Sequence, residues 1–160
     1  MNSIIQKAPL IGVGIMILDD QGQILLGSRI KQDEPQTWCF PGGKIEARES
    51  LEASAVRELL EETGLDLSLS IDQLQPFVSF IDTFSEQINI TTGIFIHLEN
   101  SSLKQNIKIT EPHIFESWQW FPLNQLPQPL FPATEVMIEV WENKPISNRW
   151  KVYRIEKTSV

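Results

Sequence analysis

Apolar residues follow a strand-like pattern in two pairs of segments that stand on either side of one helical segment. Leu10 to Leu18 alternates small and apolar residues, a polar turn ending in Gly22 follows, and Gln23 to Arg29 resumes the apolar pattern. Phe77 to Phe84 and Ile88 to Leu98 repeat this arrangement across a short polar segment. Because two such runs joined by turn-forming residues are typical of antiparallel strands, each pair predicts a β-hairpin.

The segment between the two pairs has helical composition and one acidic side. Ser50 to Thr63 is rich in Leu, Ala, Glu and Arg, which are good helix formers, and Gly64 is typical of a helix end. At about 100° per residue, Glu58, Glu61 and Glu62 fall within an arc of roughly 100°, and apolar residues cover the adjoining half of the helix. The pattern predicts a helix that packs through one side and carries three carboxylates beside it.

The remaining segments are shorter and complete a fold with mixed strands. Their expected structures are a loop at 30–37, a short buried segment at 38–40, a mobile loop at 99–110, an aromatic strand at 118–121, one helical turn at 123–126, a helix at 133–141, and an edge strand or partner contact at 148–156. This order favours an α/β (α+β) fold whose helices cover both faces of a mixed sheet. One hundred and sixty residues predict a single domain, 1–160.

Composition and net charge indicate which ligands the protein can bind and in which cellular compartment it is found. A net charge of −8 argues against tight binding to duplex nucleic acid, which depends on cations that neutralise phosphates, but it is compatible with small phosphorylated ligands. The longest apolar run, around Leu10 to Leu18, is too short to span a bilayer, and the first residues lack a signal-peptide pattern. The single cysteine, Cys39, excludes an internal disulfide and is expected to be buried. We therefore predict a cytoplasmic protein that does not enter a membrane.

The spacing of charged residues around the predicted helix indicates a divalent metal site. From Gly43 to Leu65 the sequence reads G-x5-E-x7-R-E-L-x-E-E-x-G-L, where x is any residue. Carboxylates this close repel one another, and a bound cation reverses the sign of the interaction. Hard oxygen ligands favour Mg²⁺, with Mn²⁺ as an alternative, and Arg57 and Glu49 are placed to hold the ligands through salt bridges. A solvated helix face is the other interpretation, but this spacing arises by chance with a probability on the order of 10⁻⁷.

The same residues match every specified position of the Nudix box, so the chain resembles the Nudix hydrolases. The resemblance, carried by residues 43–65, implies a Nudix fold, which is an α/β/α sandwich with a mixed central β-sheet. It also implies Mg²⁺-dependent cleavage of a nucleoside diphosphate linked to another moiety, with water as the nucleophile. By this resemblance Glu58 and Glu62 are the principal metal ligands with Glu61 assisting, and Glu58 is also a candidate base. A backbone carbonyl of Gly42 or Gly43 is the expected further ligand.

Two segments at and before the start of the box resemble the MutT-like branch, whose members hydrolyse nucleoside triphosphates. They are Gly27 to Arg29 and Trp38 to Lys44. By this resemblance Arg29 is the first candidate for a contact to a phosphate or to the base. Lys44, which is expected beside the metal loop, is the second candidate. The alternative for both is a solvated surface side chain.

Two later segments bear on the substrate. Glu111 to Leu123 resembles a segment in which a loop acid precedes an aromatic strand, and Glu116 is the first candidate there for a further metal ligand or base, with Glu111 as the alternative. Thr134, a further candidate for substrate binding, stands where purine-selective MutT-like enzymes have an asparagine that binds the base. Because a hydroxyl cannot reproduce the paired donor and acceptor of an amide, this departure argues against a specific preference for oxidised guanine nucleotides. A base could stack on one of four aromatic residues: Phe80, Phe84, Trp118 or Phe131.

The leading interpretation is a nucleoside triphosphate pyrophosphohydrolase that releases a nucleoside monophosphate and pyrophosphate. Hydrolysis of ADP-ribose, a nucleotide sugar or a dinucleoside polyphosphate is the alternative, because the box does not separate these activities. A module that senses a nucleotide without cutting it is a further alternative, although none of the box carboxylates is replaced here. The tryptophan-containing tail leaves a homodimer open.

Overall fold

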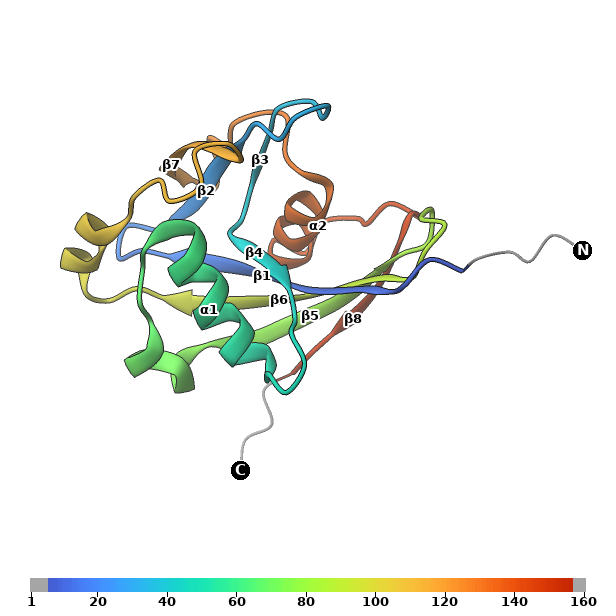
Figure 1. Ribbon diagram of the computed structural model, residues 1–160, viewed down its shortest axis with the longest axis horizontal. Helices are drawn as coiled ribbons and strands as arrows, with labels where there is room; N and C mark the ends of the chain where they lie inside the picture. The colour runs from blue at the N-terminus through green and yellow to red at the C-terminus, as the bar shows by residue number, and fades with distance from the viewer. Residues whose placement is uncertain (1–5, 157–160) are drawn as a thin grey trace, which may run out of the picture.

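The computed structural model describes residues 6–156, which fold around a mixed β-sheet with a helix on each side (Figure 1). The main elements are β1 (Leu10–Leu18), β2 (Gln23–Arg29), β3 (Thr37–Cys39), β4 (Gly42–Lys44), α1 (Leu51–Thr63), β5 (Gln75–Asp82), β6 (Asn89–His97), β7 (Phe115–Pro122), α2 (Pro132–Trp141) and β8 (Trp150–Arg154). Two short 3-10 helices are η1 (Ser68–Gln73) and η2 (Ser101–Asn106). In this part of the chain, every helix is too short or too polar to cross a membrane.

The sheet is arranged around β1, whose two edges are used differently. The strand order is β3-β2-β1-β6-β5-β8, with β4 paired to β1 and β7 paired to β2. Along one edge, β1 runs parallel to β6 from Leu10 opposite Asn89 to Leu18 opposite His97. Along the other edge, β1 pairs with β4 near its start and with β2 at its end. The strands β2 and β4 therefore leave the same edge of β1 at different points (Figure 1).

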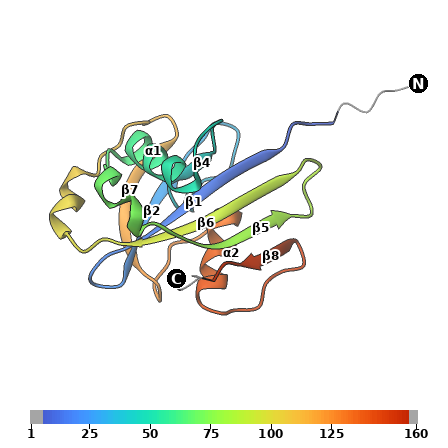
Figure 2. The same cartoon turned by 90° about the horizontal axis from the view of Figure 1, so that it is seen from below.

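Two apolar clusters hold the helices against opposite faces of the sheet (Figure 2). Successive side chains of a strand point to opposite faces, so β1 contributes to both clusters. Ile15 and Ile17 belong to the cluster beneath α1, and Met16 belongs to the cluster beneath α2. On α1, Ala55 and Leu59 are one turn apart and fully buried. Because burial of each large apolar side chain contributes roughly 1.5–3 kcal/mol, the two clusters fix the helices on the sheet.

The structure contains both predicted hairpins and both predicted helices, with small differences at their ends. The pairs β1–β2 and β5–β6 are antiparallel. The helix α1 follows Ser50, whose hydroxyl accepts a hydrogen bond from the Ala53 backbone N–H at 3.0 Å, and it ends at Gly64 with φ of 75°. The helix α2 begins at Pro132, one residue earlier than predicted, because proline is favoured in the first helical turn.

Two predicted segments differ from the structure. The helical turn predicted at 123–126 is wrong, because this segment forms a turn and Pro127 disfavours helical backbone in the residue before it. The segment 99–110, predicted as a loop, contains η2. This 3-10 helix is capped by Asn100, whose side chain accepts a hydrogen bond from the Ser102 backbone N–H at 3.1 Å. The aromatic strand predicted at 118–121 is the centre of the longer strand β7.

The tail predicted as an edge strand or a partner contact forms an edge strand. The strand β8 pairs antiparallel with β5, from Arg154 opposite Val78 to Trp150 opposite Asp82. Just before β8, Arg149 donates hydrogen bonds to Asp82 from Nε at 3.0 Å and from Nη2 at 2.8 Å. The Arg149 guanidinium lies 4.8 Å from the centre of the Trp150 ring, and Asp82 is 7% exposed. This ion pair holds the start of β8 against the sheet.

We expect Asp82→Asn to destabilise the protein by about 1–2 kcal/mol at neutral pH, because the partly exposed Arg149 loses a charged partner. Hydrogen bonds from Arg149 hold the pKa of Asp82 below its usual range. A lowered folded-state pKa gives stability that is present above the unfolded-state value of about 4 and is lost as the pH falls through the folded-state value. Urea unfolding of the wild-type protein and of Asp82→Asn between about pH 3 and 7 measures how this stability difference depends on pH. A difference in unfolding free energy that does not shrink below about pH 4 would contradict the prediction.

Candidate active site

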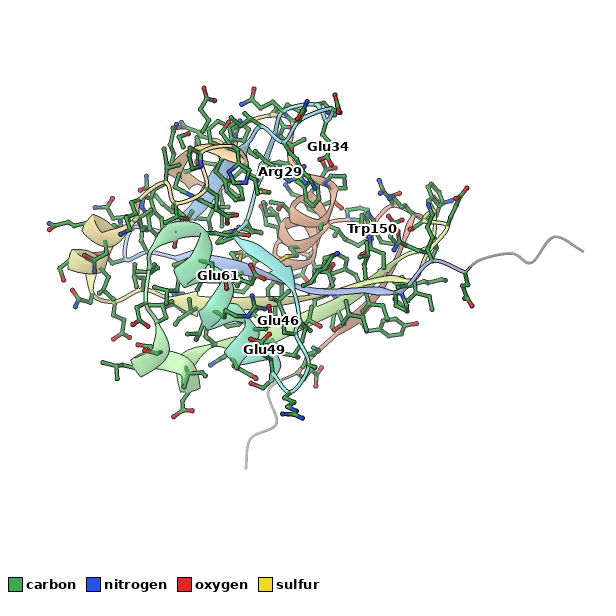
Figure 3. The ribbon with its side chains drawn as sticks, in the orientation of Figure 1. Arg29, Glu34, Glu46, Glu49, Glu61 and Trp150 are labelled. Atoms are coloured by element: carbon green, nitrogen blue, oxygen red, sulfur yellow. The ribbon has the colours of Figure 1, made fainter. Side chains whose placement is uncertain are left out.

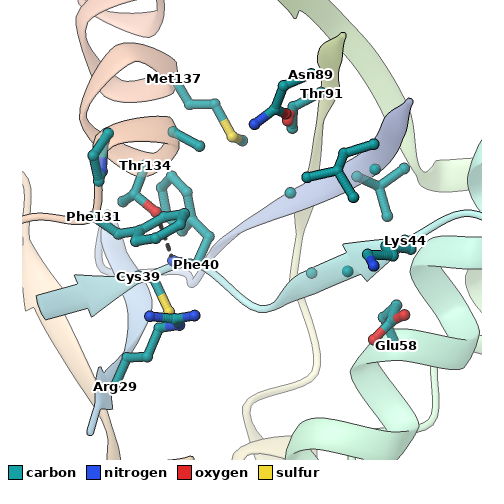
Figure 4. A pocket seen from close by; sticks show the side chains of 18 of the residues that line it. Arg29, Cys39, Phe40, Lys44, Glu58, Asn89, Thr91, Phe131, Thr134 and Met137 are labelled. Atoms are coloured by element: carbon teal, nitrogen blue, oxygen red, sulfur yellow. Dashed lines mark hydrogen bonds between the residues drawn. The ribbon is translucent and has the colours of Figure 1, made fainter. Parts of the chain in front are cut away.

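A cavity of about 630 Å³ opens where β4 and β2 leave β1. Its walls come from β1, β4 and α1 and from the starts of β6 and α2 (Figure 4). The three glutamates of the predicted metal site line this cavity, and so do Gly42 and Gly43. The residues that the sequence assigns to the metal site therefore converge on one cavity.

Two of these glutamates are buried between α1 and β4. Glu58 and Glu62 are one helical turn apart, and each is 9% exposed. The Gly42 backbone N–H donates a hydrogen bond to Glu62 Oε2 at 3.2 Å. A Cβ added at Gly43 would lie 2.4 Å from Glu58 Oε1, a distance that real Cβ atoms do not show. A side chain at this position would displace the Glu58 carboxylate, whereas glycine lets the backbone of β4 approach it.

The surroundings of these two acids disfavour their charged forms. Burial raises the pKa of Glu58, against the hydrogen bond and charge of Arg57. Burial also raises the pKa of Glu62 to about 9, and the carboxylates of Glu58, Glu111 and Glu61 act in the same direction. Several carboxylates thus crowd one region, and a cation placed there would relieve both the burial cost and the repulsion.

The donor set fits a hard divalent cation. Carboxylate oxygens favour Mg²⁺ or Mn²⁺, and Glu58 and Glu62 would hold the ion with Glu61 assisting. Within residues 6–156, no three acidic, imidazole or thiol side chains already enclose an ion position. Water and substrate oxygens would complete the coordination, as is typical of Mg²⁺. The carbonyl ligand expected at Gly42 or Gly43 stays a prediction.

Arg57 is the centre of the salt-bridge network predicted from the sequence. Its partners Glu49 and Glu61 are labelled in Figure 3. Its Nε and Nη2 donate to the two carboxylate oxygens of Glu49 at 2.7 and 2.8 Å. Its Nη1 donates to Glu58 Oε1 at 3.0 Å and to Glu61 Oε2 at 3.3 Å. Its Nη2 also donates to the carbonyl oxygen of Lys44 at 2.9 Å. One guanidinium therefore orients Glu58 and ties α1 to the end of β4.

Basic side chains line the same cavity. Arg29 at the end of β2 and Lys44 at the end of β4 both do so, as does Lys31, which the sequence did not single out. Arg29 forms an ion pair with Glu34, and its guanidinium lies 5.0 Å from the centre of the Phe131 ring. The cavity thus combines carboxylates that suit a metal with cations that suit phosphate oxygens.

The structure separates the two candidate loop acids. Glu111 lines the cavity, and its charge contributes to the raised pKa values of Glu58 and Glu62. Glu116 is exposed, does not line the cavity, and accepts a hydrogen bond from Ser28 Oγ at 3.3 Å. The geometry therefore disfavours the first candidate, Glu116, and favours the alternative, Glu111. The cause is a β-bulge in the β2–β7 pairing beside Ser28, which changes the register at Glu116.

Thr134 lines the cavity, but its hydroxyl already has a structural partner. It is 3% exposed and accepts a hydrogen bond from the Phe40 backbone N–H at 2.9 Å. Burial and this hydrogen bond leave the hydroxyl only its O–H donor for a substrate, so the predicted contact stays a prediction. Of the four stacking candidates, Phe131 lines the cavity, and the other three do not. Cys39 is buried as predicted, and burial raises the pKa of its thiol to about 12.

Three further residues of the cavity wall carry no sequence motif: Asn89, Thr91 and Met137. Asn89 and Thr91 lie at the start of β6, and Met137 lies on α2 (Figure 4). The one available signal was the alternation of side chains along β6, which places Asn89 and Thr91 on one face. That signal does not show which face carries the cavity.

The fold and the site together define a hydrolase of nucleotide pyrophosphates, built on a mixed sheet between two helices. The chain belongs to the Nudix family, since the family model described as NUDIX domain matches residues 8–141. The family predicted from the box is therefore confirmed, and the protein is a Nudix hydrolase.

Individual relatives agree with this family. The chain is 28% identical over 131 residues to an RNA pyrophosphohydrolase from Novosphingobium aromaticivorans, in a match that covers 75% of this chain and 81% of that protein. The structure of a MutT NUDIX hydrolase from Burkholderia pseudomallei is 31% identical with a TM-score of 0.68, covering 83% of this chain and 98% of that one. The NUDIX domain of Shewanella oneidensis NrtR complexed with ADP ribose shares the fold, with 24% identity, a TM-score of 0.64, and coverage of 86% and 88%. The predicted fold class is confirmed.

We expect Arg57→Ala to weaken Mn²⁺ binding by roughly 10- to 100-fold, because Glu58 loses the group that orients it. Titration of the free Mn²⁺ signal by electron paramagnetic resonance measures this affinity. Glu52→Gln is the matched control, since Glu52 lies on the first turn of α1 and does not line the cavity. Unchanged Mn²⁺ affinity in folded Arg57→Ala would limit Arg57 to holding α1 against β4.

Proposed function

We propose that the protein is a nucleoside triphosphate pyrophosphohydrolase, which cleaves a nucleoside or deoxynucleoside triphosphate to the monophosphate and pyrophosphate. The observation that supports this most strongly is that the box acids and four basic side chains line one cavity, and of these cations Arg29, Lys31 and Lys44 stand apart from Arg149, which is paired with Asp82. The cavity volume of about 630 Å³ is in the range of small-molecule sites. A triphosphate requires several cationic partners close together, and this cavity supplies them on more than one wall.

Each group of residues has a separate part in the proposed reaction. The acids of α1 would hold Mg²⁺ or Mn²⁺, and Arg57 would keep Glu58 in position. The ion, when bound, supplies positive charge that neutralises phosphate oxygens during the displacement. Arg29 and Lys44 would bind other phosphate oxygens and fix the substrate. Glu111 and Glu58 line the cavity as candidate acceptors of the proton released by the attacking water.

A second candidate is removal of pyrophosphate from the 5′ end of an RNA. The likeness to the RNA pyrophosphohydrolase of N. aromaticivorans favours it. A net charge of −8 opposes wide contact with the phosphates of a nucleic acid strand. Free triphosphates therefore remain the first candidate, and a 5′-triphosphorylated RNA belongs in the same assay.

Pyrophosphate and phosphate release in the presence of Mg²⁺ separates these activities. The panel contains canonical and oxidised nucleoside triphosphates, a 5′-triphosphorylated RNA, ADP-ribose, a nucleotide sugar and a dinucleoside polyphosphate. We expect pyrophosphate release from free triphosphates, a loss of roughly 100-fold or more in Glu58→Gln, and unchanged turnover in Glu52→Gln. Turnover limited to another member of the panel would reassign the substrate. Tight binding of one member without turnover would indicate a sensor.

Arg29→Ala should raise KM roughly 10-fold and lower kcat less, because Arg29 is proposed to bind phosphate or base both before and during the reaction. Steady-state kinetics on the preferred triphosphate measures both constants. Lys151→Ala removes an exposed cation of β8 that does not line the cavity, so it controls for net charge. A wild-type KM in Arg29→Ala for every accepted substrate would exclude this role.

A further inference from the structure

The cavity wall formed by β6 and α2 carries the side-chain amide of Asn89, which has no role in the proposed reaction at the phosphates. Asn89 and Thr91 of β6 line the cavity beside Met137 of α2, and their side chains are directed into it (Figure 4). Both residues are partly exposed. The side-chain hydrogen bonds found within residues 6–156 include neither the Asn89 amide nor the Thr91 hydroxyl. Both polar groups are therefore available to a ligand.

The strand order places this wall at a distance from the box that one bound nucleotide can span. The strand β1 lies between β4 and β6, so that Gly12 is opposite Lys44 on one side and opposite Thr91 on the other. Neighbouring strands are about 4.8 Å apart, which separates the backbones of β4 and β6 by roughly 10 Å. A nucleotide whose phosphates lie beside the box would cross β1 and bring its base toward β6.

The surface between the two walls suits a flat ring. Gly12 and Gly14 of β1 line the cavity and present backbone without side chains. A Cβ added at Gly14 would lie 2.8 Å from Met137 Sδ, so the thioether sits directly against the glycine. Methionine sulfur makes favourable contacts with aromatic rings. Trp150, whose ring centre is 5.3 Å from that of Phe80, also lines the cavity.

The chemistry of the amide matches the edge of a nucleobase. An asparagine side chain carries a donor and an acceptor side by side, which pair with adjacent acceptor and donor groups on one base edge. Thr134 of α2 cannot do this, because a hydroxyl lacks the paired donor and acceptor of an amide, and this residue is 3% exposed with its hydroxyl accepting a hydrogen bond from the Phe40 backbone N–H. In this chain the amide able to read a base lies on β6 and not at the start of α2.

We propose that Asn89 determines base specificity by hydrogen-bonding the edge of the nucleobase of the bound nucleotide. The inference rests on the proposed function, which places the phosphates beside the box. The base lies on the glycine backbone of β1 against Met137, and its edge faces Asn89. Substitution of Asn89 changes which base is preferred, whereas the phosphates and the sugar are held elsewhere in the cavity.

Isothermal titration in the presence of Mg²⁺ with AMP, GMP, CMP, UMP and the base-free probe ribose 5-phosphate tests this. Wild-type protein should bind one nucleotide more tightly than the others and than the probe. Asn89→Ala should reduce that advantage by roughly 10- to 100-fold and leave ribose 5-phosphate unchanged. Asn89→Asp, which is nearly isosteric but only accepts hydrogen bonds, should shift the order toward guanine, which offers adjacent N–H donors.

Asn106→Ala is the matched control, because Asn106 is exposed at the end of η2 and does not line the cavity. Equal wild-type affinities for all five ligands, absence of nucleotide binding, or an equal loss for every ligand in Asn89→Ala would overturn the inference. If Asn89→Ala does not fold, the order of nucleotide affinities in Asn89→Asp tests the inference, and an unchanged order would overturn it.

A base preference that depends on Asn89, without pyrophosphate release from triphosphates, would overturn the proposed reaction and keep this inference. Pyrophosphate release from triphosphates, with a base preference that does not change in Asn89→Ala, would keep the proposed reaction and overturn this inference.

Discussion

The burial of two α1 carboxylates against the glycine backbone of β4 is the constraint on which the site depends. Glu58 and Glu62 are each 9% exposed, and burial disfavours their charged forms. Their position is possible because Gly43 leaves room for a carboxylate and because Arg57 supplies a fixed positive charge. The same Arg57 donates a hydrogen bond to the carbonyl oxygen of Lys44, so Glu58 and the end of β4 are positioned by one group. A site held this way suits a cation and the charged oxygens that accompany it.

The strand β1 connects this local constraint to the rest of the molecule. Its alternating side chains enter both apolar clusters, so α1 and α2 are anchored to the same strand. Its first half pairs with β4 on one edge and with β6 on the other, which places the box and the wall containing Asn89 on either side of one glycine-containing segment. Although the protein carries a net charge of −8, the cations Arg29, Lys31 and Lys44 line this cavity. The fold thus gathers opposite charges where a phosphorylated ligand needs them.

Much of the site could be predicted because the box is local. Helix periodicity places the box glutamates on one side of α1. Glu49 and Arg57 are close in the chain, so their side chains can reach each other and form a salt bridge. Arg29 and Lys44 reach the cavity because each ends a strand that borders it. Segments of low regularity were less predictable. Residues 123–126 turn instead of forming a helical turn, since the effect of the following Pro127 outweighs their helical composition.

The sequence by itself determined the family, the helix that carries the acids and the two hairpins, because these depend on spacing between residues close in the chain. Only the tertiary structure decided the rest of the cavity. It placed Glu111 beside the box and Glu116 away from it, where Glu116 is the unpaired residue of a β-bulge between β2 and β7. It assigned the Thr134 hydroxyl to the Phe40 backbone and brought Asn89 to the wall across β1 from the box. These positions depend on pairings between segments far apart in sequence, which no local pattern encodes.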